Sequence, residues 1–189
     1  ILADYAIKNK WNFIFGDEID MLGRMIKAAN HFGSETIIQG STESPFLFYN
    51  NIDEVFKMHI ESDFDISKTD YLPDGAGYAF FKTDTLRVSH KKGNSRHRSE
   101  LVSSYIFDNQ TEFRINSVSP KKELKRSDIR ITVDYPEDLV FCRKLYSNLI
   151  GKKNLIEMSD IINYWDNNRD LRNDVEEIGV DWGHGRLWD

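Results

Sequence analysis

Apolar residues along the chain alternate between a helical and an extended spacing. One side of a helix over residues 20–32 carries Met21, Leu22, Met25, Ile26, Ala29 and Phe32. Gly33 follows this stretch as a C-terminal cap. Residues 36–39 and 129–133 are short runs rich in β-branched side chains, which favours strands. The pattern therefore predicts strands and helices that follow one another along the sequence.

The same spacing predicts the remaining elements. Strands are expected at residues 11–15, 64–67, 77–81 and 113–118. Helices are expected over 52–60, 84–88, 99–107, 136–149 and 159–165. In the 136–149 helix the predicted apolar stripe is Leu139, Cys142, Leu145, Tyr146 and Leu149. This order predicts an α/β fold, a doubly wound and mostly parallel sheet with helices on both faces.

Two parts of the chain differ in character. Residues 1–150 are predicted to form one α/β domain, and residues 151–189 a C-terminal extension that ends in a glycine-rich tail with two tryptophans, Trp182 and Trp188. We expect this tail to pack on its own domain or on a partner subunit. The first ten residues resemble the end of a helix, so we also expect that a segment of the protein precedes Ile1.

Composition restricts the class of protein. With 189 residues, of which 40% are hydrophobic and 13% aromatic, the chain is long enough to bury a core. A single cysteine, Cys142, excludes disulfides within the chain and a zinc site made of cysteines. No run reaches the roughly 18 apolar residues of a membrane span and no leader is visible, so a cytoplasmic protein without membrane contact is expected.

Residues 87–98 are strongly basic although the net charge of the chain is -6. The acidic balance argues against a protein devoted to nucleic acid. A solvated loop is the simplest interpretation of the basic run, and a loop that captures a phosphate or an anionic substrate is the alternative. Contact with nucleic acid is the weakest interpretation, because no aromatic residues are interleaved with the basic ones.

Asp134 stands where the predicted strand over 129–133 turns into the helix that opens at Pro136. Open α/β enzymes bind ligands at such carboxyl ends of strands. Asp134-x-x-Glu137 has the spacing of a capping box, in which each side chain binds the other residue's amide. Alternatively, Asp134 holds a magnesium ion against a phosphate, and the two roles can coexist. Arg130 is either a bidentate ligand of an anion or an ion pair at the sheet edge.

Four motifs together resemble one enzyme family. They are Phe15-Gly16-Asp17 with Met21-Leu22-Gly23-Arg24, then Thr42-Glu43-Ser44-Pro45, Pro73-Asp74-Gly75 and the stretch from Arg130 to Leu139. In this order they resemble the cytidylyltransferases that activate acidic sugars, including the 3-deoxy-manno-octulosonate and acylneuraminate enzymes, and more closely the spore-coat polysaccharide branch. The resemblance runs from about Ile1 to Leu149.

The resemblance implies a function and a set of site residues. Members of the family transfer CMP from CTP to an acidic sugar with release of pyrophosphate, and many of them are homodimers. It implies Mg²⁺ held by Glu43 and Asp134, and catalysis by Arg130 and Asp134. It further implies contacts to the nucleotide by Ser41 and Thr42, and contacts to the substrate by Asp74, Gly75 and Glu100.

Several positions depart from the family's pattern. Glu43 stands where aspartate is usual, Gly77 and Ala79 replace acidic residues, and Leu101 beside Glu100 replaces a histidine. The family's amino-terminal loop of glycine and arginine, which grips CTP, has no counterpart here, so this chain alone is expected to be inactive. The departures leave a second hypothesis open, a non-catalytic homologue that acts as a binding or scaffold subunit.

Overall fold

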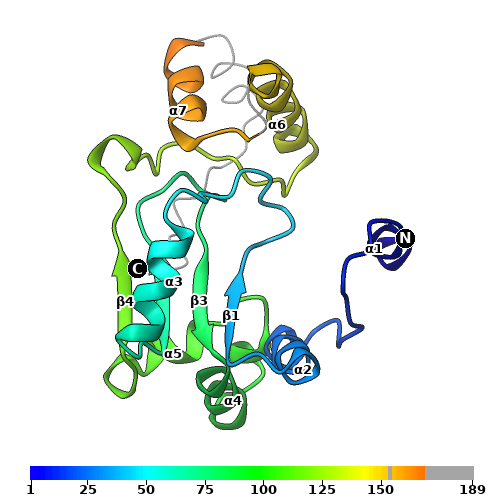
Figure 1. Cartoon of the computed structure of the whole chain (residues 1–189), viewed down its shortest axis with the longest axis vertical. Coiled ribbons are helices and arrows are strands. Elements are labelled where there is room, and N and C mark those ends of the chain that lie inside the picture. Colours follow the sequence, from blue (N-terminus) through cyan, green and yellow to red (C-terminus); the bar gives the residue numbers. More distant parts are fainter. Residues whose placement is uncertain (153–154, 169–189) are drawn as a thin grey trace. The chain divides into compact units, whose positions relative to one another are not determined.

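The computed structural model describes residues 1–152 and 155–168 (Figure 1). The α-helices are α1 (Leu2–Lys8), α2 (Met21–Phe32), α3 (Ile52–Glu61), α4 (Thr83–Lys92), α5 (Ser104–Asp108), α6 (Pro136–Leu149) and α7 (Met158–Asn167). Short 3-10 helices are η1 (Arg96–Arg98), η2 (Gln110–Glu112), η3 (Lys122–Leu124) and η4 (Ile150–Lys152). The strands are β1 (Thr36–Gln39), β2 (Ile66–Thr69), β3 (Ala79–Lys82) and β4 (Ile115–Val118). The predicted α/β fold is confirmed.

The four strands form one sheet in the order β1-β3-β2-β4. The amides of Asp65 and Asp70, at the two ends of β2, donate to the carbonyls of Arg114 and Val118, so β2 and β4 run in parallel. The amide of Thr69 donates to Tyr78 and that of Lys82 to Asp65, so β3 runs opposite to β2. The strand at 36–39 was predicted at its observed bounds, and the other three begin two residues later than expected.

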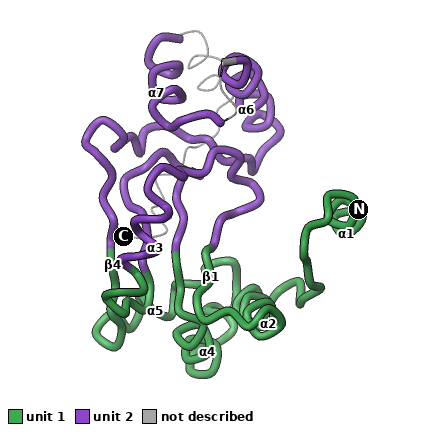
Figure 2. Tube along the Cα trace, in the orientation of Figure 1, with its two compact units in different colours: residues 1–38, 59–66, 80–116 green, residues 39–58, 67–79, 117–189 purple. Residues whose placement is uncertain are grey.

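The chain divides into two compact units (Figure 2). Unit 1 contains residues 1–38, 59–66 and 80–116, and unit 2 contains residues 39–58, 67–79 and 117–189. The boundaries between the units fall within the four strands and within helix α3. The candidate site described below belongs to unit 2, apart from Glu100.

In unit 1, local signals define helix α2. The Asp20 carboxylate accepts the Gly23 amide at 2.7 Å at the N-terminus, and Gly33 ends the helix in the left-handed conformation at φ 64°. Helix α2 packs against α4. The buried face of α4 carries hydroxyls as well as Leu86, because Thr83, Thr85 and Ser89 are buried with hydrogen-bonded side chains. A helix was predicted only over 84–88 because this face has so few apolar residues.

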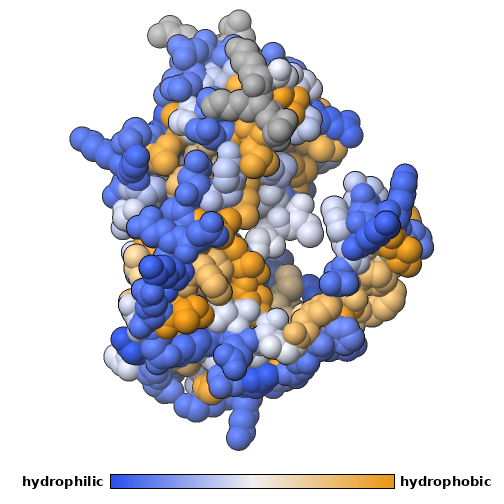
Figure 3. All heavy atoms as spheres, in the orientation of Figure 1, coloured by the Kyte–Doolittle hydropathy of each residue, from blue (hydrophilic) through white to orange (hydrophobic). Residues whose placement is uncertain are grey.

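The segment before α2 corrects one prediction. Residues 11–15 were expected to form a strand, but they are extended chain outside any sheet. Trp11, Phe13 and Phe15 are exposed. The Trp11 ring makes an edge contact with Tyr5 of α1, and the rings of Phe13 and Phe15 make one with each other. Apolar surface is correspondingly visible along the N-terminal segment (Figure 3). Alternating apolar residues form a strand only where a neighbour pairs with the backbone.

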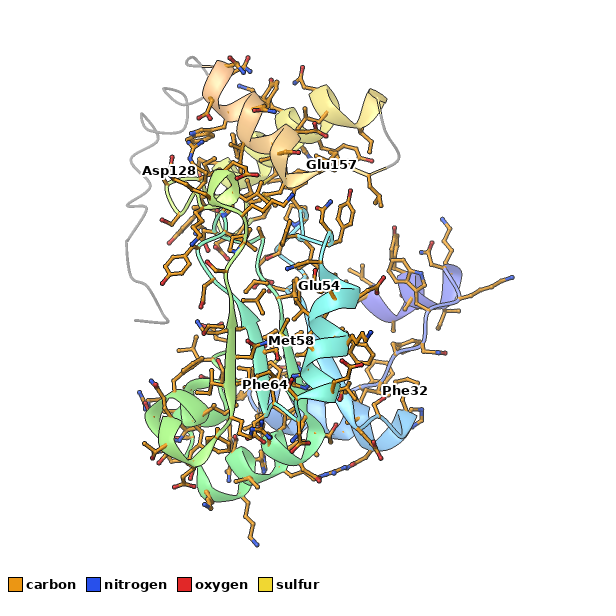
Figure 4. All side chains as sticks on the ribbon, turned by 60° about the vertical axis from the view of Figure 1, so that its left-hand side comes forward. Phe32, Glu54, Met58, Phe64, Asp128 and Glu157 are labelled. Atoms are coloured by element: carbon orange, nitrogen blue, oxygen red, sulfur yellow. The ribbon has the colours of Figure 1, made fainter. Side chains whose placement is uncertain are left out.

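In unit 2, helices α6 and α7 pack against each other. Their ring contact joins Phe141 and Trp165, whose centroids are 5.6 Å apart at 88°. The buried face of α6 contains Phe141, Cys142 and Leu145, whereas Leu139 and Tyr146 of the predicted stripe are exposed. Glu157, labelled in Figure 4, precedes the first turn of α7, so the helix begins one residue before Ser159.

Two further predictions concern the ends of the chain and the membrane. The tail from Trp182 to Trp188 lies outside the described residues. Within the described part of the chain, none of the helices combines the length and the apolar character that a membrane span needs.

Candidate active site

The predicted strand over 129–133 is extended chain that forms a single parallel bridge. Asp74 donates its amide to the Ile129 carbonyl and accepts the Ile131 amide, both at 2.8 Å. Backbone pairing between the two segments does not continue past Asp74, because residues 73–76 form a turn in which the Ala76 amide donates to the Pro73 carbonyl at 3.0 Å. Strand 129–133 was therefore a wrong prediction, but Ile129 and Ile131 are buried and fix the segment firmly.

Gly75 joins the 73–76 turn to this segment by close packing. Its φ of 89° is unfavourable for residues with a Cβ. A Cβ at this position would lie 2.8 Å from the Thr132 backbone nitrogen. The structure shows that Gly75 packs closely against Thr132, and the predicted contact of Gly75 with substrate stays a prediction.

Glu43 and Asp134 stand at the ends of two segments that lie side by side. The Glu43 carbonyl accepts the Val133 amide at 2.9 Å and the Thr132 hydroxyl at 3.4 Å. The Glu43 side chain is exposed and accepts the Thr42 hydroxyl at 3.3 Å. A hydrogen bond from the Ser41 side chain, followed by its own amide, lowers the pKa of the Glu43 carboxyl. Ser41 and Thr42, expected to bind nucleotide, therefore hold an ionised carboxylate in place.

Arg130 is the centre of an ion-pair network with three aspartates. Its guanidinium donates to Asp74 at 2.8 Å, to Asp138 at 3.0 Å and to the Asp134 carboxylate. Burial alone would lower the pKa of Arg130, but the hydrogen bonds to Asp138 and Asp134 outweigh it and raise the pKa. Of the two alternatives for Arg130, the structure shows the ion pair. Direct contact with a substrate stays a prediction.

Asp138 occupies the capping position that was predicted for Glu137. Its carboxylate accepts the amides of Asp134 and Tyr135, at 2.9 and 3.0 Å. The Asp134 side chain is paired with Arg130 and does not cap α6. The predicted Asp134–Glu137 box is therefore wrong by one residue. The sequence already contained the correct signal, because Asp138 lies three residues after Tyr135 and follows Pro136, a residue favoured in the first helical turn.

Glu100 and the basic run belong to unit 1. Glu100 is exposed in the turn between η1 and α5. Residues 89–92 of the basic run were expected in a loop, but they complete helix α4. Three of the basic side chains pair with acidic ones, Arg87 with Asp84, Lys92 with Glu112 and Arg96 with Asp108. These pairs reduce the positive field that a captured anion would meet.

The carboxylates suit a magnesium ion that keeps most of its own ligands. Magnesium is commonly held by one or two carboxylates together with waters and substrate phosphates. Glu43 and Asp134 are both exposed and carried by adjoining segments, so they supply this donor chemistry. In the described part of the chain, no group of three or more histidine, cysteine or acidic side chains forms a complete protein cage for a metal.

No protein-family model matches the chain. It is 27% identical over 164 residues to the uncharacterized protein MJ1063 of Methanocaldococcus jannaschii, a match that covers 86% of this chain and 66% of that protein. It is 22% identical over 177 residues to the spore coat polysaccharide biosynthesis protein SpsF of Bacillus subtilis, which covers 93% of this chain and 73% of SpsF. The chain thus spans just under two thirds of the archaeal protein and about three quarters of SpsF.

A solved structure shares the fold. The cytidylyltransferase from Leptospira borgpetersenii superposes with a TM-score of 0.82 over 90% of this chain and 72% of that chain, at 16% identity. At this identity the likeness establishes the fold. The resemblance indicated by the motifs is confirmed: the chain has the α/β fold of a cytidylyltransferase and is related in sequence to a spore-coat polysaccharide biosynthesis protein.

Proposed function

We propose that the chain is part of a nucleotidyltransferase of polysaccharide biosynthesis that transfers CMP from CTP to an acidic sugar and releases pyrophosphate. The fold shared with a cytidylyltransferase and the similarity to SpsF support this class of enzyme. The observation that carries the proposal is the edge where the Glu43 and Asp134 segments adjoin, because these are the two positions that the resemblance assigns to metal binding.

The residues of this edge fit that chemistry. Glu43 and Asp134 would hold a magnesium ion, whose charge neutralises the α-phosphate and the departing pyrophosphate. Ser41 and Thr42 keep Glu43 ionised by hydrogen bonds to its carboxylate. Arg130 orients Asp74 and Asp134 by pairing with both. We also propose a homodimer, on the basis of the resemblance alone.

The test is CTP-dependent release of pyrophosphate by the complete protein. The purified protein is incubated with CTP, MgCl2 and a panel of acidic sugars that includes 3-deoxy-manno-octulosonate and N-acetylneuraminate, and the CMP-sugar is identified by mass spectrometry. Asp134→Asn is the control, because it removes one negative charge at nearly constant shape. Turnover with wild type and a large fall in turnover with Asp134→Asn support the proposal. Absence of any CMP-sugar with every acceptor contradicts it.

A non-catalytic subunit is the second candidate. It is favoured by the pairing of Arg130 with Asp134, which already gives a proposed metal ligand a cationic partner, and by Gly77 and Ala79 at positions where the family has acidic residues. A subunit of this kind would bind CTP without consuming it. An upward shift of the melting temperature with CTP and Mg²⁺, combined with no pyrophosphate release, would favour it over the enzyme.

A further inference from the structure

The three partners of Arg130 differ in their exposure to solvent. The Asp138 side chain is 3% exposed, whereas those of Asp74 and Asp134 are 58% and 49% exposed. Water and salt screen an exposed ion pair and leave a buried one largely unscreened. The three contacts of one guanidinium are therefore unequal, and the bond to Asp138 should be the persistent one.

The geometry of the Arg130–Asp138 pair supports this ranking. Nε and Nη2 of Arg130 both face the Asp138 carboxylate, at 3.3 and 3.0 Å. A two-point contact of this kind fixes the plane of a guanidinium, which a single contact does not. Burial alone would raise the pKa of the Asp138 carboxyl, but Arg130 and two backbone amides outweigh it and keep the pKa below its usual value.

The same carboxylate also fixes the backbone beneath Asp134. Asp138 accepts the amides of Asp134 and Tyr135 and so holds the turn that carries the Asp134 side chain. Asp74 approaches the opposite end of the guanidinium, at Nη1. One buried carboxylate thus determines where the arginine lies, and the arginine contacts both exposed carboxylates.

We propose that Asp138 is the positioning residue of this edge: it anchors Arg130 and the 134–135 turn, and thereby sets the directions of the Asp134 and Asp74 carboxylates. The anchoring stands on the geometry of the chain itself. Its consequence for turnover rests on the proposed nucleotidyl transfer, so the two parts are tested by different measurements.

The anchoring is tested by NMR of the Arg130 Nε–H group, assigned by its loss in Arg130→Lys. Asp138→Asn is the central variant, because the amide oxygen can still accept the backbone N–H groups of the cap while the charge that holds Arg130 is removed. We expect the Nε–H proton to exchange with water at least about tenfold faster in Asp138→Asn. We expect it to be unchanged in Asp134→Asn and Asp74→Asn, whose carboxylates contact other atoms of the guanidinium.

Two results overturn the anchoring. One is an Nε–H signal in Asp138→Asn that exchanges as slowly as in wild type. The other is loss of the signal in Asp134→Asn, which would make Asp134 the anchor. The measurement on Asp134→Asn and Asp74→Asn changes only exposed side chains. It therefore still tests whether Asp134 or Asp74 anchors Arg130 if Asp138→Asn does not fold.

The functional consequence is tested by a double-mutant cycle in turnover. Loss of a residue that orients a ligand typically lowers activity about 10- to 100-fold, and this is the fall expected for Asp138→Asn. If Asp138 acts through Asp134, the double variant Asp134→Asn/Asp138→Asn turns over no more slowly than Asp134→Asn alone. A multiplicative loss would show that Asp138 does not act through Asp134 and would overturn this positioning role.

Asp128→Asn is the matched control. Asp128 makes two hydrogen bonds to Arg126, at 2.8 and 2.7 Å, in the same unit, and Arg126 also pairs with Asp166. Its loss removes an arginine-bound carboxylate outside the site, and turnover should stay within about twofold. If wild type shows no turnover, the proposed function fails, whereas the NMR result still decides whether Asp138 anchors Arg130.

Discussion

Replacing Gly75 with alanine tests whether Gly75 mainly allows the Pro73-Asp74-Gly75 turn to pack against Thr132 or contacts the substrate. The perturbation has two parts. Alanine must adopt the φ of 89°, and its Cβ would lie 2.8 Å from both the nitrogen and the Cβ of Thr132. Thr132 cannot withdraw freely, because its hydroxyl and the next amide both bind Glu43. We expect a loss of stability whether or not a substrate is present.

Gly33 separates the two parts of the perturbation. It has a φ of 64°, and an added Cβ would meet nothing within 4 Å. A residue with a Cβ in the left-handed region costs about 1–2 kcal/mol, so this is the loss expected for Gly33→Ala. Overpacking against fixed atoms adds about 1–3 kcal/mol, so Gly75→Ala should lose about 2–5 kcal/mol. Gly151, with open space and no positive φ, should tolerate alanine.

The assay is guanidinium chloride unfolding followed by tryptophan fluorescence and circular dichroism, from which the free energy of unfolding is obtained. Agreement of the two probes establishes whether a single free energy describes the chain. If Gly75→Ala is no less stable than Gly33→Ala, the packing argument is refuted. If its stability matches wild type and only CTP binding is lost, Gly75 is a substrate contact.

Three further predictions concern buried groups. Burial raises the pKa of the Cys142 thiol to about 12, so a disulfide reagent at pH 8 should leave the native chain unmodified and react only after unfolding; fast native reaction contradicts the burial. The pKa of Asp138 is lowered in the folded chain, so its carboxylate stabilises the fold above about pH 4 and this contribution disappears as the pH falls through the folded pKa. The stability gap between wild type and Asp138→Asn should therefore shrink as the pH falls below about pH 4 in denaturant titrations, and a constant gap contradicts the pairing. Trp165→Ala removes the ring that packs on Phe141 and should lower the free energy of unfolding by about 3–5 kcal/mol, whereas Tyr164→Ala beside it should lose much less.

Helix α2 shows what a single sequence can predict well. Its signals are all local: a capping aspartate, an apolar stripe and a terminal glycine lie within fourteen residues of one another. The observed helix begins one residue after the predicted start and ends at the predicted residue. Where a boundary is fixed by the residues next to it, reading the sequence is sufficient.

The predictions for residues 11–15 and for helix α4 were wrong for opposite reasons. The first has the side chains of a strand, but a strand also needs a pairing partner, which the local sequence does not reveal. The second buries threonine and serine, whose hydroxyls bind carbonyls and a carboxylate, so its buried face does not look apolar. Whether a strand finds a pairing partner, and whether a buried hydroxyl finds a hydrogen-bond partner, depends on the tertiary structure. The hydropathy of the sequence alone cannot predict either.

The position of the candidate site could be predicted from the sequence, but the partners of its charged side chains could be predicted only in part. The two carboxylate-bearing turns were expected to adjoin, and their backbones do adjoin. The capping residue was misassigned because two aspartates compete for two tasks within five residues. Asp134 pairs with Arg130, and Asp138, which is buried, takes the amides. Spacing rules propose both assignments, and burial decides between them.

The charge of the network decides what Arg130 can do in the ligand-free chain. Three aspartates share one guanidinium, so the group remains net negative, and the ionised Glu43 is carried by the adjoining segment. An arginine attracts phosphate when its own charge is unmatched, and here it is more than matched. Anion binding by Arg130 would first require release of Asp74 or Asp134. For the proposed transfer, cations bound at Asp134 and Glu43 must therefore offset the charge of the triphosphate, and Arg130 serves to keep these carboxylates in place.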